Sequence, residues 1–218
     1  MKFGSYRFQL KKLSAYLFRL RRSLIFSIVL SLTTGIFGSQ ALEQNETLAG
    51  KLLVATSEMG DPRFGETVIY MVKDDDSGAM GLVINRPMAK GPIGDLLKSF
   101  GIESDASDRE IILHYGGPVG QNQGFLLHTD DVLLDDSTKV KDGVVMTADT
   151  RILQAIARGK GPRQYLFMVG YAGWAPGQLE AEIKENAWYV VSADKTFIFG
   201  TDAEKKWRQA LDKRQIPL

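Results

Sequence analysis

Two apolar segments joined by a short polar turn place the strongest constraint on the fold of this chain. Residues 66–73 (ETVIYMVK) are rich in β-branched and aromatic residues, and residues 79–85 (AMGLVIN) continue the same pattern. Between them lies DDDSG at 74–78, whose aspartates, serine and glycine are typical of a tight turn. The sequence therefore predicts an antiparallel β-hairpin, which argues against a purely parallel sheet.

The rest of the chain predicts further strands and short helices in no strict alternation. We expect the strands at 110–115 and 125–129 to pair across the loop GGPVGQNQG, and GYAGWAPG at 170–177 to form a glycine-permitted turn into a helix. About seven or eight strands and three or four helices indicate a single compact α+β domain. The other strands are expected at 48–55, 144–147, 164–169 and 188–192, and the helices at 92–100, 149–158, 178–186 and 203–214.

The N-terminal segment, residues 1–41, differs from the rest of the chain. It holds seven basic residues and no acid, residues 24–37 are almost purely apolar, and SQA at 39–41 places small residues at the −3 and −1 positions. These features are typical of a secretory signal peptide, and the apolar core is shorter than the ~20 residues of a membrane span. We predict a signal peptide or, alternatively, an N-terminal anchor at 1–41, followed by a domain at 42–218. The domain would then be periplasmic or membrane-anchored, and cytoplasmic if the segment is not a signal.

The charge of the predicted domain limits its partners. Seven of the 27 basic residues and none of the 26 acidic residues lie in 1–41, so 42–218 carries a formal charge of −6. Binding to a nucleic acid backbone depends on cationic contacts to phosphates, which an acidic domain is poorly suited to supply. We therefore expect no nucleic acid partner, and membrane contact only through an uncleaved N-terminal segment.

The usual signatures of catalysis, metal binding and nucleotide binding are absent from the sequence. The chain has no cysteine, no G-x-S-x-G and no P-loop, and Ala172 stands where a nucleophile elbow would need serine. The two histidines, His114 and His128, lack a clear third ligand, so hydrogen-bonded structural roles are favoured over a metal site. The sequence predicts no catalytic residue, no metal and no cofactor.

The triplet Asn85-Arg86-Pro87 is the polar feature that most favours a functional role. Its arginine ends an apolar strand, where the guanidinium could bind an anion or form a structural pair with a buried carboxylate. The sequence leaves both alternatives open.

Eight segments in order along the chain resemble one family of bacterial proteins. Together they cover almost all of the predicted domain. They are LAGKLLVA at 48–55, DPRF at 61–64, ETVIYMV at 66–72, GAMGLVINRP at 78–87, GGPV at 116–119, GFLLH at 124–128, RILQAIARGKGP at 151–162 and GYAGWAPGQLEAEIKENAW at 170–188. On these motifs the chain is identified as resembling the AlgH/YqgE family.

The resemblance implies a curled, partly barrel-like mixed β-sheet flanked by short helices, and a surface cleft lined by shared residues. It implies no reaction and no cofactor. The shared residues that map to this chain are Asp61, Pro62, Phe64, Asn85, Arg86, Pro87, Gly116, Gly117, Pro118, Gly170, Tyr171, Gly173 and Trp174. We predict them as a ligand- or partner-binding surface.

Three functions remain open at this stage. The motifs favour a non-enzymatic binding or regulatory module that takes a small ligand or a protein partner. A label of transcriptional regulator is attached to some family members, but it conflicts with the acidic domain and with export. The third is a hydrolase-like enzyme that uses Asp61, Asn85, Arg86 or His114.

Overall fold

The predicted hairpin is present in the structure. The computed structural model describes residues 47–103, 108–200 and 202–213. Strand β2 (Val68–Asp75) pairs antiparallel with β3 (Gly78–Val83), and a two-residue turn connects them. Ser77 is fixed in this turn because its amide and hydroxyl both donate to Oδ1 of Asp75, at 2.9 and 2.6 Å. The hairpin prediction is confirmed.

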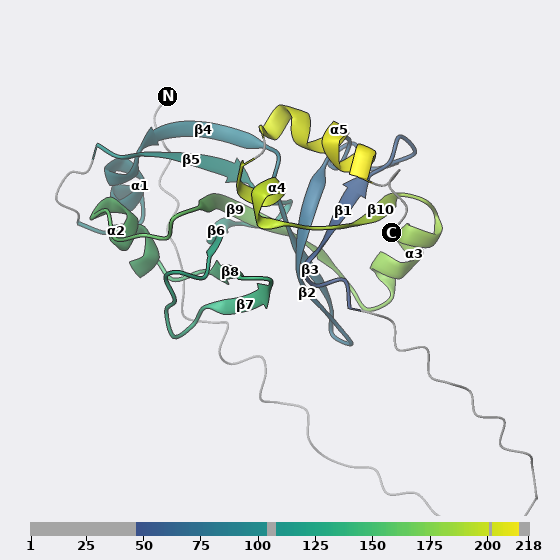
Figure 1. The fold of residues 1–218 in the computed structure, drawn as a ribbon, viewed down its shortest axis with the longest axis horizontal. Helices are drawn as coiled ribbons and strands as arrows, with labels where there is room; N and C mark the ends of the chain where they lie inside the picture. Colours follow the sequence, from purple (N-terminus) through teal and green to yellow (C-terminus); the bar gives the residue numbers. More distant parts are fainter. Residues whose placement is uncertain (1–46, 104–107, 201, 214–218) are drawn as a thin grey trace, which may run out of the picture. The chain divides into compact units, whose positions relative to one another are not determined.

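Ten strands in the described part of the chain form one curled, mixed sheet that does not close (Figure 1). The other eight are β1 (Lys51–Ala55), β4 (Pro87–Pro92), β5 (Glu110–Tyr115), β6 (Val119–Thr129), β7 (Thr138–Lys141), β8 (Val144–Thr147), β9 (Tyr165–Trp174) and β10 (Trp188–Ser192). Eight strands follow the order β10-β1-β2-β3-β9-β6-β8-β7, while β5 joins β9 and β4 joins β5. The β5–β9 pair is parallel and the other pairs are antiparallel, so the fold is α+β with a mixed sheet.

Strand β9 connects the two parts of the sheet. Its first half pairs with β6 along one edge and with β5 along the other, and residues 172–174 pair with β3. Gly170 lies between these halves with φ +73°, a left-handed conformation that glycine adopts without strain. The turn expected over 170–177 is therefore wrong in its first part and confirmed only in its last residues. GYAGW continues as strand, and the turn follows it.

The expected pairing between the strands around GGPVGQNQG is also wrong, because β9 lies between β5 and β6. Both strands pair with the same residues of β9, from opposite edges. The chain leaves β5 at Gly116, whose amide donates to the carbonyl of Val169 and whose carbonyl accepts from Val83, at 2.8 and 2.9 Å. A long-range strand has replaced the local hairpin that the sequence suggested.

Five short helices within the described ranges cover the sheet. They are α1 (Ile93–Ser99), α2 (Arg151–Ala157), α3 (Gln178–Lys184), α4 (Lys195–Gly200) and α5 (Ala203–Lys213). Figure 1 shows α1 and α2 near one end of β4 and β5, and α4 and α5 over the region where β1, β2 and β5 approach each other. None of these helices has the length and apolar character that crossing a membrane requires. The predicted signal segment lies outside the described residues.

The core has two layers because successive residues of β1, β2 and β3 point to opposite faces of the sheet. One face packs Tyr70 and Leu82 against Phe197 of α4 and Ala210 of α5. The other face packs Ile69, Val83 and neighbouring aromatic residues against α3. A further cluster buries Ile93, Leu97 and Ile152 between α1, α2 and the sheet. The described residues thus form one compact unit.

Candidate ligand-binding cleft

Asn85 and Arg86, directly after β3, hold the loop at 61–66. Both terminal guanidinium nitrogens of Arg86 donate to backbone carbonyl oxygens of this loop, at 2.6 Å each. Oδ1 of Asn85 accepts from the amide of Val68, and its Nδ2 donates to the carbonyl of Glu66, both at 2.9 Å. The structure thus brings two predicted motifs together, with these side chains bound to backbone and not to a carboxylate.

Asp61 and Pro62 lie at the outer part of this loop. The carboxylate of Asp61 accepts from the guanidinium of Arg63, with Oδ2 and Nη2 2.6 Å apart. The hydrogen bond from Arg63 lowers the pKa of Asp61 below its ordinary value. Arg63 is largely exposed, so this pair fixes a surface turn.

An aromatic row lies behind the loop. The rings of Phe64 and Trp188 meet edge to face at 5.5 Å, and those of Trp188 and Trp174 at 6.2 Å. Both indole N–H groups donate to Oε2 of Glu182 on α3, at 2.9 and 2.8 Å. Phe64 and Trp174, from separate motifs, are thus joined through Trp188, which was not in the predicted set.

Gly116, Gly117 and Gly170, which we call the glycine junction, lie where β5 separates from β9. A Cβ on Gly116 would lie 2.2 Å from the carbonyl oxygen of Gly170, and a Cβ on Gly117 would lie 2.1 Å from the carbonyl carbon of Tyr171. Gly117 has φ +151° and Gly170 has φ +73°. Two backbones approach too closely here for any side chain, so these glycines are required by the fold.

The thirteen predicted surface residues do not all face one way. Phe64 and Trp174 pack on one side of the sheet, whereas Tyr171 packs on the other against Phe125, with ring centroids 5.9 Å apart. Gly173 and Pro118 lie near the junction, the first exposed and the second half-buried. The role of this set as a binding surface stays a prediction. Pro87 alone of the set lines the cavity described next.

A cavity of about 480 Å³, here called the Lys206 cleft, lies between strands β4 and β5 and helices α4 and α5. Its apolar lining includes Ile112, Leu166 and Phe199, and its buried polar lining residues are His114 and Lys206. Glu110 and Asp202 also line the cleft and are exposed.

A larger depression of about 660 Å³ lies between α1 and α2. Its charged lining residues Lys98, Glu103 and Arg158 are exposed, so water satisfies them. The Lys206 cleft is smaller, but two of its polar lining residues, His114 and Lys206, are withdrawn from water.

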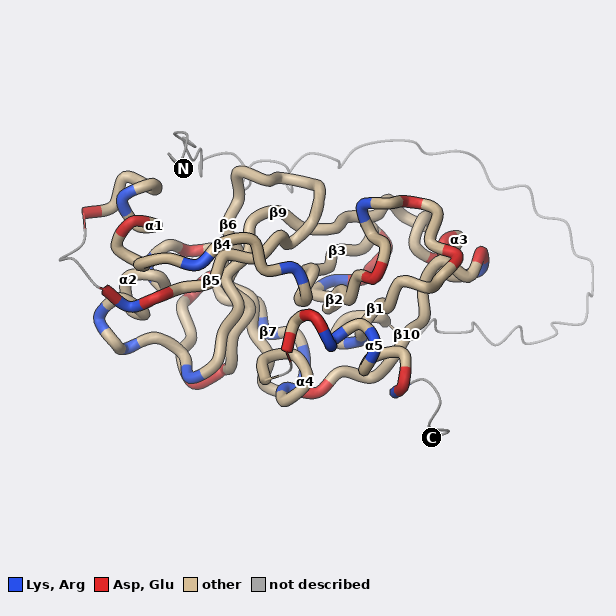
Figure 2. Tube along the Cα trace, turned by 90° about the horizontal axis from the view of Figure 1, so that it is seen from above, with Lys and Arg blue, Asp and Glu red and all other residues tan. Residues whose placement is uncertain are grey.

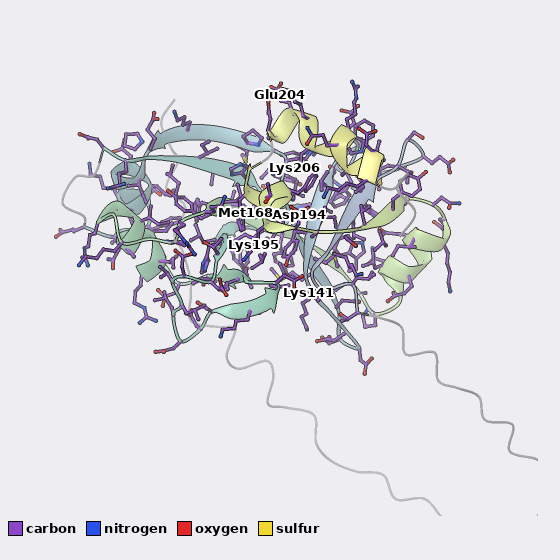
Figure 3. The ribbon with its side chains drawn as sticks, in the orientation of Figure 1. Lys141, Met168, Asp194, Lys195, Glu204 and Lys206 are labelled. Carbon is purple, nitrogen blue, oxygen red and sulfur yellow. The ribbon has the colours of Figure 1, made fainter. Side chains whose placement is uncertain are left out.

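Lys206 lies on the inner face of α5, between that helix and the sheet (Figure 3), and is only 2% exposed. Its Nζ donates to the carbonyl of Ile198 at 2.7 Å and to that of Ile84 at 3.3 Å. Burial lowers the pKa of Lys206 to about 8, and the negative charge of Asp202 opposes this shift. At pH 7 the side chain is therefore a buried ammonium.

His114 of β5 is the second buried polar group of the cleft. Its Nδ1 lies 3.1 Å from the carbonyl oxygen of Phe167, which can only accept, so Nδ1 carries the proton and Nε2 keeps a lone pair. Burial lowers the pKa of His114, and the nearby charge of Lys206 lowers it further. The imidazole is neutral at pH 7.

The cleft thus combines a cation, a neutral imidazole and an apolar wall. Among the residues that the structure describes, Lys206 forms no ion pair, and no buried side-chain nitrogen or oxygen lacks a hydrogen bond. Within the described residues, Lys206 therefore has hydrogen bonds but no ion-pair partner, and the charge of Asp202 acts on it without direct contact. Within the same residues, no three His, Cys, Asp or Glu side chains cluster as metal ligands would.

His128, the other histidine, lies apart from the cleft in β6. Its Nδ1 is 2.8 Å from the carbonyl oxygen of Thr129, and its Nε2 is 2.8 Å from Oγ1 of Thr147. Both ring nitrogens are occupied, so His128 is a hydrogen-bonded structural histidine, as the sequence favoured.

Lys206 is not among the residues predicted from the sequence, although a signal for it is present. Ala203, Lys206, Trp207 and Ala210 are spaced as the inner face of a helix, so the lysine stands on an otherwise apolar stripe. A lysine at such a position either extends its side chain so that the ammonium group reaches solvent, or it buries the ammonium group. The periodicity alone does not decide between the two.

The fold and the sequence together place the chain in a family. A family model described as AlgH-like, DUF179, matches residues 52–218. The chain is 44% identical to a UPF0301 protein of Methylococcus capsulatus over 176 residues, which cover 81% of this chain and 96% of the relative. It is 43% identical to a UPF0301 protein of Caulobacter vibrioides, over 80% of this chain and 90% of the relative. The chain belongs to the AlgH-like family.

Solved structures agree with this assignment. The solution structure of AlgH from Pseudomonas aeruginosa matches with a TM-score of 0.69 and 34% identity, over 79% of this chain and 92% of that one. A crystal structure of a Corynebacterium diphtheriae protein matches with a TM-score of 0.60 and 21% identity, over 82% and 92%, and shows the fold alone. The resemblance inferred from the eight motifs is confirmed, as is the α+β fold.

Proposed function

We propose that this chain is a non-enzymatic binding module that holds a small acidic ligand in the Lys206 cleft. The observation that carries the proposal is the buried ammonium of Lys206, which forms no ion pair within the described part of the chain. A carboxylate or phosphate in the cleft would supply the missing counter-charge.

The energetics of burial support this ligand class. Withdrawing an ammonium from water costs several kcal/mol, which two backbone carbonyls offset only in part. An anion placed beside Lys206 is attracted by a charge that folding has already removed from water. Binding therefore does not require the desolvation of Lys206, only that of the anion. The acids nearest the cleft, Glu110 and Asp202, are exposed and do not pair with Lys206.

The shape of the cleft supports a small molecule over a large partner. A volume of about 480 Å³ falls within the ~300–1,000 Å³ of typical ligand sites. The apolar wall of Ile112, Leu166 and Phe199 would contact the hydrocarbon part of the ligand, while Lys206 takes its acidic group.

The distribution of charge supports neither nucleic acid binding nor a direct regulator. Figure 2 shows Lys and Arg interleaved with Asp and Glu along α1 and α5, without a continuous basic stripe on these two helices. The hydrolase-like alternative needed several polar groups in one pocket. Hydrogen bonds in and around the loop at 61–66 instead occupy the side chains of Asp61, Asn85 and Arg86. None of these three residues lines the cleft that contains His114.

A titration of the full chain tests the proposal. Acetate, succinate and inorganic phosphate are added while amide chemical shifts are followed, and we expect saturable changes confined to β5, α4 and the start of α5. Lys206→Met should abolish them, whereas Lys205→Met removes an exposed lysine one position away and should leave them unchanged. If none of the three acids causes saturable changes, or if Lys206→Met binds as well as the parent chain, the proposal is wrong.

We also propose that residues 1–41 direct export, with the binding domain in the periplasm. Support comes from the basic, apolar and small-residue order of this segment. The N-terminus of the protein isolated from cells tests this, and we expect it near residue 42. An intact Met1 on a soluble cytoplasmic protein would contradict it.

A further inference from the structure

The Lys206 cleft offers a reactive amine as well as a cation. We propose that Lys206 forms a reversible imine with a small 2-oxo acid, the carboxylate of the acid lying beside the resulting iminium. This inference rests on the proposed function, because it names a subclass of acidic ligand for the same cleft. Compared with the proposed function, the inference requires a ligand with a carbonyl group next to its carboxylate, and it includes a covalent step.

The position of Lys206 supports a nucleophilic role. Lys206 lines a cavity bounded mainly by apolar groups, the setting that activates lysine toward carbonyl carbons. Because its pKa is lowered to about 8, roughly one molecule in ten carries the free amine at pH 7. An exposed lysine of ordinary pKa holds less than about one part in a thousand in that form.

The hydrogen bonds of Nζ are compatible with the reaction. An ammonium has three N–H groups, and Lys206 uses one at 2.7 Å toward Ile198 and one at 3.3 Å toward Ile84. A protonated imine retains a single N–H, which can keep the shorter bond to Ile198. The longer bond to Ile84 is given up, and the C=N bond takes the place of the remaining hydrogens.

In this step His114 accepts the proton that Lys206 must release before its amine can react. Nε2 of the neutral imidazole accepts a proton from the ammonium, and the amine lone pair attacks the carbonyl carbon of the 2-oxo acid. The carbonyl oxygen takes one proton from the nitrogen as the carbinolamine forms and a second from the imidazolium, and it then leaves as water while nitrogen retains one hydrogen. Ammonium plus carbonyl thus gives iminium plus water, with charge conserved and no oxidant or reductant involved.

The charge balance explains why an acid suits this step. The iminium keeps the positive charge of Lys206, so the carboxylate on the adjacent carbon remains paired after the bond forms. A neutral aldehyde of the same size would leave that charge without a partner, and we expect it to react less completely.

Reductive trapping tests the inference on the full chain. Pyruvate is added with sodium cyanoborohydride at pH 7, and the modified lysines are identified by peptide mass mapping. We expect a mass gain of one pyruvic acid less one oxygen atom at Lys206, at least about tenfold faster than at exposed lysines such as Lys205 in the same molecules. Labelling of exposed lysines at an equal or higher rate would overturn the proposal, whether or not any variant folds.

Two further measurements separate this proposal from the simpler one. If acetate and pyruvate bind reversibly without an adduct at Lys206, the imine is wrong and the acid-binding function stands. If neither binds, both are wrong. Replacement His114→Gln should slow labelling at Lys206 severalfold, whereas unchanged labelling would remove His114 from the proton transfer.

Discussion

The glycine junction and the Lys206 cleft are both built on β5 and its neighbours, but they differ in how their groups are satisfied. At the junction, backbone atoms leave no room for a Cβ. The side chains of Asn85 and Arg86, which follow β3, form hydrogen bonds with backbone atoms of residues 63–68. In the cleft, Lys206 is as deeply buried but forms no ion pair in the described part of the chain. The glycine-rich motifs thus maintain the fold, while the buried cation without an ion-pair partner lies beside them.

The largest expected effect is at the junction. Gly117→Ala forces a Cβ to within 2.1 Å of the backbone of Tyr171, and it also places alanine at φ +151°. We expect the free energy of unfolding to fall by about 3 kcal/mol or more, measured by urea denaturation.

Gly91→Ala in β4 is the matched control. A Cβ there has no atom within 4 Å, and the residue is not among the glycines with positive φ. This variant should change the unfolding free energy by less than about 0.5 kcal/mol. Equal losses for the two variants would break the contrast between junction and surface glycines.

The next effect is the pH dependence of stability at Lys206. Its pKa is about 8 when folded and about 10.4 when unfolded, so between these values the unfolded chain binds more protons. The penalty for burying the ammonium is present in full below pH 8 and is relieved as pH rises toward 10.4. We expect the parent chain to gain up to about 3 kcal/mol relative to Lys206→Met between pH 7 and pH 10.

Urea denaturation of both proteins across this pH range provides the measurement. Subtracting Lys206→Met removes the titration of all other groups that the two proteins share. A difference that stays constant with pH would show that Lys206 is not buried as a charge, and the contrast with the junction would disappear.

Arg86 should have a smaller effect than Gly117. Arg86→Met removes two charged hydrogen bonds to the loop at 61–66, and we expect a loss of about 2 kcal/mol with increased proteolysis of that loop. Arg63→Met breaks an exposed pair with Asp61 and an exposed contact with the Phe64 ring, and it should cost less than Arg86→Met. Equal effects would mean that the loop is not held by Arg86.

The smallest expected effect is at Glu182. Glu182→Gln keeps one oxygen for the two indole N–H groups but turns an amide toward Gln178, whose Nε2 donates to Oε1 of Glu182. We expect a loss of about 1 kcal/mol and a shift in tryptophan fluorescence. Glu180→Gln, at an exposed position of the same helix, should alter neither.

Much of the fold follows from the sequence where the signal is local. The hairpin at β2 and β3 and the helix α1 are encoded by turn residues and by apolar periodicity. Three elements were not predicted. Strand β4 is exposed and bounded by Pro87 and Pro92, β7 is short and polar, and α4 begins after Asp194, whose Oδ1 caps the amide of Phe197 at 2.7 Å.

The errors arise where pairing partners are distant in sequence. No local pattern reveals that β9 inserts between β5 and β6, because the contacts that fix it are between backbones at Gly116, Gly117 and Gly170. The cleft is hidden for the same reason. Lys206 meets Ile84 across more than a hundred residues of chain, and only the folded sheet brings them together.

The most direct test of the account is the titration of Lys206 itself by NMR, with the lysine side chains isotopically labelled. In the free chain we expect a midpoint near 8, and saturating acetate should raise it because a bound carboxylate favours the ammonium. A midpoint in the ordinary lysine range, unchanged by acetate, would contradict the claim that a buried, unpaired cation awaits an acidic ligand in this cleft.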